Sequence, residues 1–338
     1  MNDDAVTKSG TVALVGRSNV GKSTLLNAAL ALPLAIVSRK PQTTRDRLLG
    51  VVRHGGAEIG LLDTPGFHRA RSRLGKEMNR HARRAAKEAD VVCFVVSLPP
   101  RPVGELTPHP GDLALLAQVQ EDATTPVVLV INKIDLLKRK DALLPLIAQY
   151  AERRTFAAVV PVSAQRDDGV TRILDEVAPL LPDGDPRFDE DTLTDRPLRY
   201  FAAEYVREPI LRVTSQEVPH AVAVTVERFS ERSGGLVDIH ATIHVERNGQ
   251  KRIIIGDKGA GLKRIGTEAR QRVEDLLGQR VNLQLFVRVT PDWRERPAAL
   301  ADFGLTLEAA ETAPLDLEGL TDDDDGEGAA APDEETDA

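Results

Sequence analysis

Hydrophobic and polar positions follow two alternating patterns through the first half of the chain. Short runs of β-branched residues are typical of buried strands, and longer stretches with apolar residues at every third or fourth position are typical of helices. The predicted strands are residues 12–15, 47–53, 57–62, 91–96, 127–131 and 157–162, and the predicted helices are residues 22–32, 75–88, 112–120, 141–153 and 170–180. This alternation predicts an α/β domain over residues 10–181, with a mostly parallel sheet covered by helices on both faces.

The pattern changes in the second half of the chain. Residues 182–197 are rich in Pro and Asp and lack apolar periodicity, which predicts a linker between domains. Residues 198–307 predict a smaller α+β domain, and residues 308–338, acidic and low in complexity, predict a disordered tail. The elements predicted for the smaller domain are helices at 198–213 and 262–277 and strands at 221–229, 236–246 and 281–289.

The net charge of −8 hides two opposite contributions. From Glu308 to the end there are 13 acidic residues and no Lys or Arg, whereas the preceding part carries 44 basic and 39 acidic residues, a net charge of +5. The overall acidity therefore does not exclude a nucleic-acid partner. The single cysteine, Cys93, excludes an internal disulfide and a CxxC metal site. The polar N-terminus and the short apolar runs lead us to expect a soluble intracellular protein.

A phosphate-binding motif precedes the first predicted helix. Gly16 and Gly21 belong to a GxxxxGK[ST] pattern that follows one predicted strand and opens one helix. In such a loop the backbone N–H groups surround phosphate oxygens, Lys22 neutralises the β- and γ-phosphates, and the Ser23 hydroxyl ligates Mg²⁺. A chance glycine-rich turn is the alternative, and the coincidence of strand, motif and helix argues against it. The candidate GTP-binding residues of this loop are Gly16, Arg17, Ser18, Asn19, Val20, Gly21, Lys22, Ser23 and Thr24.

Two later loops favour guanine over adenine. In an NKxD motif after a predicted strand, Asp135 can accept hydrogen bonds from both N1–H and the amino group of guanine. Adenine offers no such pair of donors and would leave the carboxylate unpaired, at a cost of about 1–3 kcal/mol. Asn132 would tether neighbouring loops and Lys133 would lie along the base. Ser163 and Ala164 follow the next strand, where the Ala164 N–H could reach guanine O6.

A further loop would sense the γ-phosphate. Asp63, Thr64, Pro65 and Gly66 follow the strand at 57–62. Asp63 would orient a water on Mg²⁺, and loss of a contact between the Gly66 N–H and the γ-phosphate would release the loop after hydrolysis. Asp63 alone could be a turn or capping residue, but the order and spacing of these elements resemble the translation-factor-related class of small GTPases.

Residues 38–47 (SRKPQTTRDR) resemble the first switch segment of the Era family within that class. The resemblance implies that one threonine closes over Mg²⁺ in the GTP state, here Thr44, with Thr43 as the alternative. It also agrees with Phe67 at a position where many GTPases place a water-orienting Gln. It further implies a K⁺ ion held by Asn19, for which a loop-stabilising role is the alternative. The candidate metal ligands are Ser23, Thr44 and Asp63, and the candidate catalytic residues are Lys22, Thr44, Gly66 and Asn19.

A GxxG loop in the smaller domain resembles the KH domain. It lies between an Ile-rich segment and a predicted helix, and such a loop lets the backbone approach about four single-stranded nucleotides. Between Arg247 and Arg296 there are 12 basic and 6 acidic residues, which favours RNA over the alternative of an ordinary helix-entry loop. The type II KH arrangement implies a helix at 253–255, although these residues favour a strand by propensity, and we expect Trp293 to be a packing residue. The candidate RNA-binding residues are Ile255, Gly256, Asp257, Lys258, Gly259, Lys263 and Arg264.

Taken together, the motifs resemble the Era family over most of the chain. The resemblance implies a cytoplasmic, monomeric, GTP-hydrolysing switch that binds small-subunit ribosomal RNA and assists maturation of the small ribosomal subunit. One alternative is a membrane-associated regulatory GTPase in peripheral contact with the inner face of the cell membrane. Another is an RNA-binding protein with a vestigial nucleotide site, against which the intact Lys22, Ser23, Asp63 and Asp135 argue. The acidic tail would be either a solvating appendage or a competitor of RNA for the basic KH surface.

Overall fold

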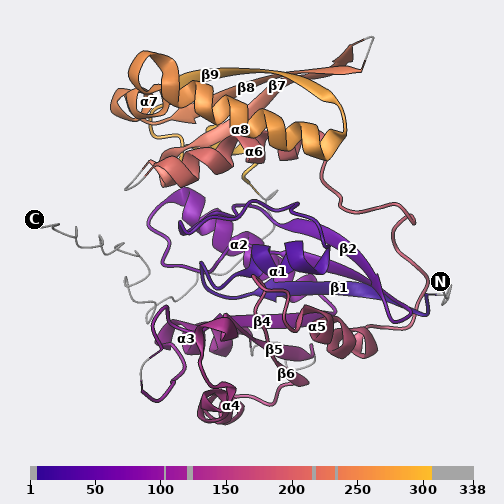
Figure 1. The fold of residues 1–338 in the computed structure, drawn as a ribbon. Coiled ribbons are helices and arrows are strands. Elements are labelled where there is room, and N and C mark those ends of the chain that lie inside the picture. Colours follow the sequence, from indigo (N-terminus) through magenta and orange to yellow (C-terminus); the bar gives the residue numbers. More distant parts are fainter. Residues whose placement is uncertain (1–5, 103, 120–124, 215–217, 233–234, 307–338) are drawn as a thin grey trace, which may run out of the picture.

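The computed structural model describes residues 6–102, 104–119, 125–214, 218–232 and 235–306. Within these ranges the chain forms a first unit built on a six-stranded sheet and a second unit built on a three-stranded sheet (Figure 1). The predicted tail, together with residue 307, lies outside the described residues. In the ranges that are described, no helix is both long enough and apolar enough to cross a membrane.

The sheet of the first unit is mostly parallel, which confirms the prediction. Its order is β2-β3-β1-β4-β5-β6; β2 pairs antiparallel with β3, and the other neighbours run parallel. The strands are β1 Lys8–Val15, β2 Leu48–His54, β3 Ala57–Asp63, β4 Val91–Ser97, β5 Val127–Asn132 and β6 Ala158–Pro161. Strand β1 begins earlier than predicted because residues 8–11 pair with β3 alone, so polar side chains are tolerated there.

Helices cover both faces of this sheet, as the continuous apolar strands require. One core lies under α1 and α5, with Leu26 and Ile173 in it, and the other lies under α2, α3 and α4, with Ala82, Leu116 and Leu146 in it. The helices are α1 Lys22–Ala29, α2 Arg73–Glu88, α3 Pro110–Val119, α4 Leu143–Ala151 and α5 Val170–Val177, with short 3₁₀ turns at Ile134–Leu136, Lys140–Ala142 and Ala178–Leu180. The carboxyl ends of β1, β3, β5 and β6 therefore present the motif loops at one edge.

The segment between the units runs along the outer strands of the first sheet (Figure 1). The buried Glu58 carboxylate accepts hydrogen bonds from the backbone N–H groups of Arg187 at 2.6 Å and Phe188 at 3.2 Å. The Val51 N–H donates to the Leu193 carbonyl at 2.9 Å. The predicted linker is thus fastened to the first unit; its limits as a domain boundary stay a prediction.

The second unit packs three helices against one face of its small sheet (Figure 1). Strand β8 is central, antiparallel to β7 and parallel to β9. The elements are α6 Leu198–Val213, η4 Pro219–Ala221, β7 Ala223–Arg232, β8 Leu236–Val245, α7 Asn248–Ile255, η5 Asp257–Gly259, α8 Ala260–Leu277, β9 Arg280–Val289 and α9 Pro297–Asp302. Helix α9 was not among the predicted elements.

Residues 253–255 are helical, as the KH resemblance implies, and their strand propensity is overridden. Within α7, Ile254 is buried in the core of the second unit while Ile253 is 57% exposed. The two buried residues of α7, Gln250 and Ile254, are four positions apart, which is the spacing of one helical face. Tertiary burial of one helical face outweighs a local preference of this size.

Candidate nucleotide-binding site

The predicted phosphate loop closes tightly around its own lysine. Gly21 has a φ of +99°, and a Cβ there would lie 2.3 Å from Asn132 Nδ2, so only glycine fits. Helix α1 begins at Lys22, whose Nζ donates to the carbonyls of Gly16 at 3.0 Å and Arg17 at 2.9 Å. The ammonium group is thereby held inside the loop where a phosphate would lie.

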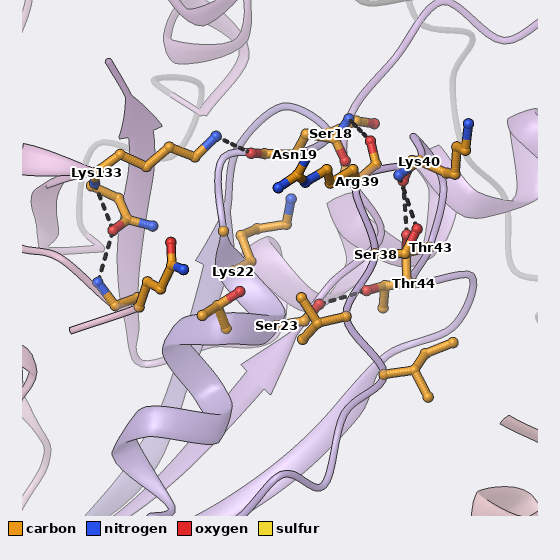
Figure 2. A pocket seen from close by; sticks show the side chains of 18 of the residues that line it. Ser18, Asn19, Lys22, Ser23, Ser38, Arg39, Lys40, Thr43, Thr44 and Lys133 are labelled. Atoms are coloured by element: carbon orange, nitrogen blue, oxygen red, sulfur yellow. Dashed lines mark hydrogen bonds between the residues drawn. The ribbon is translucent and has the colours of Figure 1, made fainter. Parts of the chain in front are cut away.

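A cavity of about 1000 Å³ opens beside this loop, large enough for a nucleotide. It is lined by residues of the phosphate loop, the switch segment (residues 38–47), the loop after β5 and the loop after β6. Leu211 and Arg212 of α6 also line it, so the second unit contributes to its wall. Figure 2 shows Lys133 on one side and the switch-segment side chains on the other, with Lys22 and Ser23 of the phosphate loop between them.

Three oxygen-bearing side chains converge at one side of the cavity. Ser23 Oγ donates to Asp63 Oδ2 at 2.6 Å, and Thr44 Oγ1 lies 3.1 Å from the same oxygen. Thr44 Oγ1 also lies 2.8 Å from Ser23 Oγ (Figure 2). Thr43 points elsewhere, because its hydroxyl donates to the Lys40 carbonyl at 2.8 Å. Of the two candidate threonines, Thr44 is therefore the one that the fold brings to the other candidate metal ligands.

The chemistry of this cluster suits Mg²⁺, which prefers oxygen ligands. Asp63 is fully buried, and its Oδ1 accepts no hydrogen bond from the described residues. Burial raises the pKa of the Asp63 carboxyl, while Lys22 and the hydroxyls of Ser23 and Thr44 act in the opposite direction. A buried carboxylate oxygen without a donor is what a metal or its water would satisfy.

The loop after β3 lies directly against the phosphate loop. A Cβ at Gly66 would lie 2.5 Å from Ser18 Cα, so this contact requires glycine. Thr64 Oγ1 anchors the loop by donating to the Leu14 carbonyl at 2.7 Å. The Phe67 side chain is buried in the core beneath the sheet, and its N–H donates to the Gly16 carbonyl at 3.2 Å. Phe67 therefore cannot orient a water by hydrogen bonding.

The predicted guanine-recognition residues lie together at the other end of the cavity. Asp135 Oδ1 accepts from Ser163 Oγ at 2.6 Å, which fixes the carboxylate. Asn132 Nδ2 donates to the Val20 carbonyl at 2.8 Å, as expected of a residue that tethers loops. The Ala164 N–H donates to Asn132 Oδ1 at 3.0 Å, so its contact with guanine O6 stays a prediction.

Asn19 connects the phosphate loop to both neighbouring loops. Its Nδ2 donates to the Arg39 carbonyl of the switch segment at 3.2 Å, and its own carbonyl accepts from Lys133 Nζ at 2.7 Å (Figure 2). The Asn19 side chain thereby ties the phosphate loop to the switch segment, which is the loop-stabilising role given as the alternative. A K⁺ ion at Asn19 stays a prediction.

One supporting pair was not predicted. The guanidinium of Arg17 is turned away from the phosphates, and its Nε donates to the buried Asp112 Oδ1 at 2.7 Å. Burial raises the pKa of the Asp112 carboxyl, and Arg17 opposes that rise. Tyr150 OH lies 3.4 Å from the second carboxylate oxygen. Arg17 thus contributes its carbonyl to Lys22, while its side chain fastens the loop to α3.

The GxxG loop of the second unit has a backbone conformation that would let a nucleic-acid backbone come close to it. Gly256 and Gly259 have φ values of +71° and +84°, and Lys258 between them has a φ of +46°. Lys258, Lys263 and Arg264 are exposed at or next to the start of α8. Trp293 is fully buried and donates from Nε1 to the Ala221 carbonyl at 2.9 Å, which confirms that it is a packing residue.

Comparison with known proteins identifies relatives of both units. A family of GTPases described as 50S ribosome-binding matches residues 11–133, and the KH domain family matches residues 217–294. The chain is 48% identical over 297 residues to GTPase Era of Geotalea uraniireducens, covering 88% of this chain and 97% of the relative. It is 49% identical over 301 residues to GTPase Era of Geobacter metallireducens, covering 88% of this chain and 98% of the relative.

Two solved structures match nearly the whole described fold. A crystal structure of an Aquifex aeolicus Era variant bound to GDP·AlF4⁻ superposes with a TM-score of 0.83 at 39% identity, covering 89% of this chain and 100% of that chain. A structure of Era with MgGDPNP and nucleotides 1506–1542 of 16S ribosomal RNA superposes with a TM-score of 0.82 at 38% identity, with coverage of 89% and 100%.

Proposed function

Because the chain belongs to the Era family of GTPases, we propose that it hydrolyses GTP as a switch and binds the 3′ region of small-subunit ribosomal RNA to assist small-subunit assembly in the cytoplasm. One observation carries the proposal: the Ser23, Thr44 and Asp63 oxygens and the Asp135 carboxylate lie in or beside the same cavity. This cavity joins a phosphate-binding loop to a guanine-specific carboxylate.

Each part of the nucleotide has a residue that would recognise it. The Asp135 carboxylate, held by Ser163, would accept the two donors of guanine. Lys22 would exchange its two carbonyl contacts for β- and γ-phosphate oxygens. Ser23, Thr44 and Asp63 would hold Mg²⁺, directly or through a water. When bound, the ion supplies positive charge against the developing charge of the transferred phosphoryl group.

Hydrolysis would depend on positioning and charge rather than on a glutamine, because Phe67 is buried. The Gly66 N–H would contact the γ-phosphate, and its loss on hydrolysis would release the loop after β3. We propose that a K⁺ ion binds at the Asn19 amide oxygen and supplies the charge that an arginine provides elsewhere. The position of Asn19 in the phosphate loop, next to the switch segment, supports this proposal.

The RNA would bind at the GxxG loop. The backbone of Gly256 to Gly259 would approach the RNA backbone, and Lys258, Lys263 and Arg264 would contact phosphates. Asp257 in the same loop opposes phosphate binding, so the basic residues must outweigh it. A cytoplasmic monomer and a peripheral membrane contact stay predictions.

Crosslinking to RNA in cells tests the proposal most directly. The full chain would be held in its GTP-bound state, either by a GTP analogue or by a substitution that slows hydrolysis. The RNA crosslinked to it would then be sequenced. We expect reads at the 3′ end of the small-subunit ribosomal RNA, reduced in a Lys258→Ala variant. Recovery of membrane lipid or unrelated messenger RNA without small-subunit RNA would contradict the proposal.

A further inference from the structure

The switch segment is held mainly from outside the unit to which it belongs. Among the described residues, the hydrogen bonds of the Thr44 hydroxyl are to the first unit, at Ser23 and Asp63. Its neighbours on both sides are bound by residues of the second unit or of the segment that leads to it. The position of the Thr44 hydroxyl therefore depends on contacts that its own domain does not supply.

Arg45 makes the most extensive of these contacts. It is 6% exposed, and its guanidinium donates to the carbonyls of Val222, of Pro219 at 3.0 Å and of His220 at 3.3 Å. It also lies 5.7 Å from the centre of the buried Trp293 ring. A guanidinium donates hydrogen bonds from a rigid planar fork, which suits three carbonyls arranged around it.

Thr43 and Asp46, on either side of Thr44 and Arg45, are also held by arginines from outside the first unit. The Thr43 carbonyl accepts from the buried Arg207 of α6, which Glu204 holds at 2.6 and 2.8 Å. Asp46 is paired with Arg196 of the linker and lies 2.8 Å from His81 Nδ1. The chain on both sides of Thr44 is thus attached to three separate places beyond the first sheet.

Arg45 has no polar partner in its own unit among the described residues. The guanidinium depends on the three carbonyls of the second unit for its hydrogen bonds. A buried charge without those acceptors is costly. If the second unit moved away, Arg45 would become solvated and the backbone next to Thr44 would lose its anchor.

We infer that Arg45 is a positioning residue, which places the Thr44 hydroxyl at the Ser23 and Asp63 oxygens by anchoring the switch segment to residues 219–222. This inference rests on the proposed GTPase function. The site for GTP and Mg²⁺ is then complete only while the second unit is in contact with the switch segment. The RNA-binding unit is then a structural component of the hydrolytic site, and GDP, which does not require Thr44, binds without it.

The test compares Arg45→Gln with Arg47→Gln in the full chain. Arg47 is exposed two residues further along and serves as the matched control. The measurements are the Mg²⁺ concentration for half-maximal GDPNP binding, the affinity for GDP and the rate of GTP hydrolysis. We expect Arg45→Gln to raise the Mg²⁺ requirement and to slow hydrolysis by at least about tenfold, as for loss of hydrogen bonds to a charged group, with GDP affinity within about twofold.

A second comparison separates positioning from general stability. The double variant Thr44→Ala/Arg45→Gln should bind GDPNP no worse than Thr44→Ala alone, because Arg45 would act only through Thr44. If Arg45→Gln also loses GDP binding, Arg45→Lys is measured instead, since it keeps the charge and loses the three-carbonyl geometry. Equal Mg²⁺ requirements for the Gln variants, or additive effects in the double variant, would overturn the inference. Failure of the wild-type chain to hydrolyse GTP would instead overturn the proposed function.

Discussion

Thr44 Oγ1 lies 3.1 Å from Asp63 Oδ2, whereas the hydroxyl of the adjacent Thr43 is directed to the Lys40 carbonyl. Neighbouring threonines in one segment therefore have opposite orientations. We predict that Thr44→Ala lowers GTP hydrolysis by about tenfold or more, because one oxygen of the Mg²⁺ site is lost. Thr43→Ala keeps the backbone carbonyl that Arg207 binds and should retain most activity. Equal losses in both variants, measured by phosphate release, would contradict this assignment.

Substitution of Asp135 should change which base is bound. The variant Asp135→Asn keeps the size of the side chain but replaces one acceptor oxygen by a donor. We expect GTP affinity to fall by roughly 10- to 100-fold, corresponding to about 1.5–3 kcal/mol for hydrogen bonds to a charged group. Xanthosine triphosphate has a carbonyl where guanine has its amino group. Its affinity should fall less than that of GTP in this variant, or should rise. Calorimetric titration with both nucleotides measures the two affinities, and a parallel loss of both would refute base recognition by Asp135.

Potassium should accelerate hydrolysis if Asn19 holds a monovalent cation. We predict faster GTP turnover in potassium chloride than in sodium chloride at equal ionic strength, because the site must match the larger ion. The preference should disappear in Asn19→Ala, while binding of GDP should change little. A wild-type rate that is the same in both salts would leave Asn19 with only its contact to the Arg39 carbonyl.

Lys258 should contribute to RNA affinity through a phosphate contact. Lys258→Ala is expected to weaken binding of single-stranded RNA about equally across sequences and to reduce the salt slope by about 1. Basal GTP hydrolysis should be unchanged, since Lys258 lies in the GxxG loop of the second unit. Lys87→Ala, an exposed lysine on α2, is the matched control. An unchanged salt slope in Lys258→Ala, determined by fluorescence anisotropy, would argue against a phosphate contact.

The second unit should lose stability in mild acid through His244. Its ring nitrogens lie 2.9 Å from Thr225 Oγ1 and 3.0 Å from Thr290 Oγ1, and the ring packs on Phe303 at 4.4 Å. Burial lowers the pKa of the His244 imidazole; Glu227 opposes this shift and Arg288 adds to it.

Because the folded pKa lies below the unfolded value of about 6.5, the unfolded chain binds the proton first as the pH falls. Stability should then decrease from about pH 6.5 towards the lower folded pKa. Melting temperatures at about pH 7.5 and about pH 5.5 should differ more for the wild type than for His244→Gln. Equal changes of melting temperature in the wild type and in His244→Gln would show that His244 does not cause the loss of stability in acid.

The motif loops were predictable from sequence because each is specified locally. The geometry of the phosphate loop follows from Gly21 and Lys22 within a few residues, and the sheet places its partners by the general arrangement of parallel strands. The strands and most helices follow from periodicity for the same reason. Short α9 gives too few turns for periodicity to be evident.

Contacts between distant segments could not be predicted. Arg17 and Asp112 are 95 residues apart, and nothing near either residue specifies their pairing. Arg45 likewise meets Val222 at a separation of 177 residues. Such pairs depend on how helices and domains pack, which single-sequence patterns do not encode. The motif therefore identified Arg17 as a member of the phosphate loop without indicating where its side chain would turn.

The link between the guanine-recognition and phosphate loops has a thermodynamic consequence. Asn132 Nδ2 donates to the Val20 carbonyl at 2.8 Å, and Lys133 Nζ donates to the Asn19 carbonyl at 2.7 Å. These two bonds fasten the halves of the site to each other, which limits the loop entropy that nucleotide binding can cost. Base and phosphates are consequently not recognised independently. A change at Asn132 would weaken even a ligand that has no base, such as pyrophosphate, because it loosens the cradle that receives the phosphates.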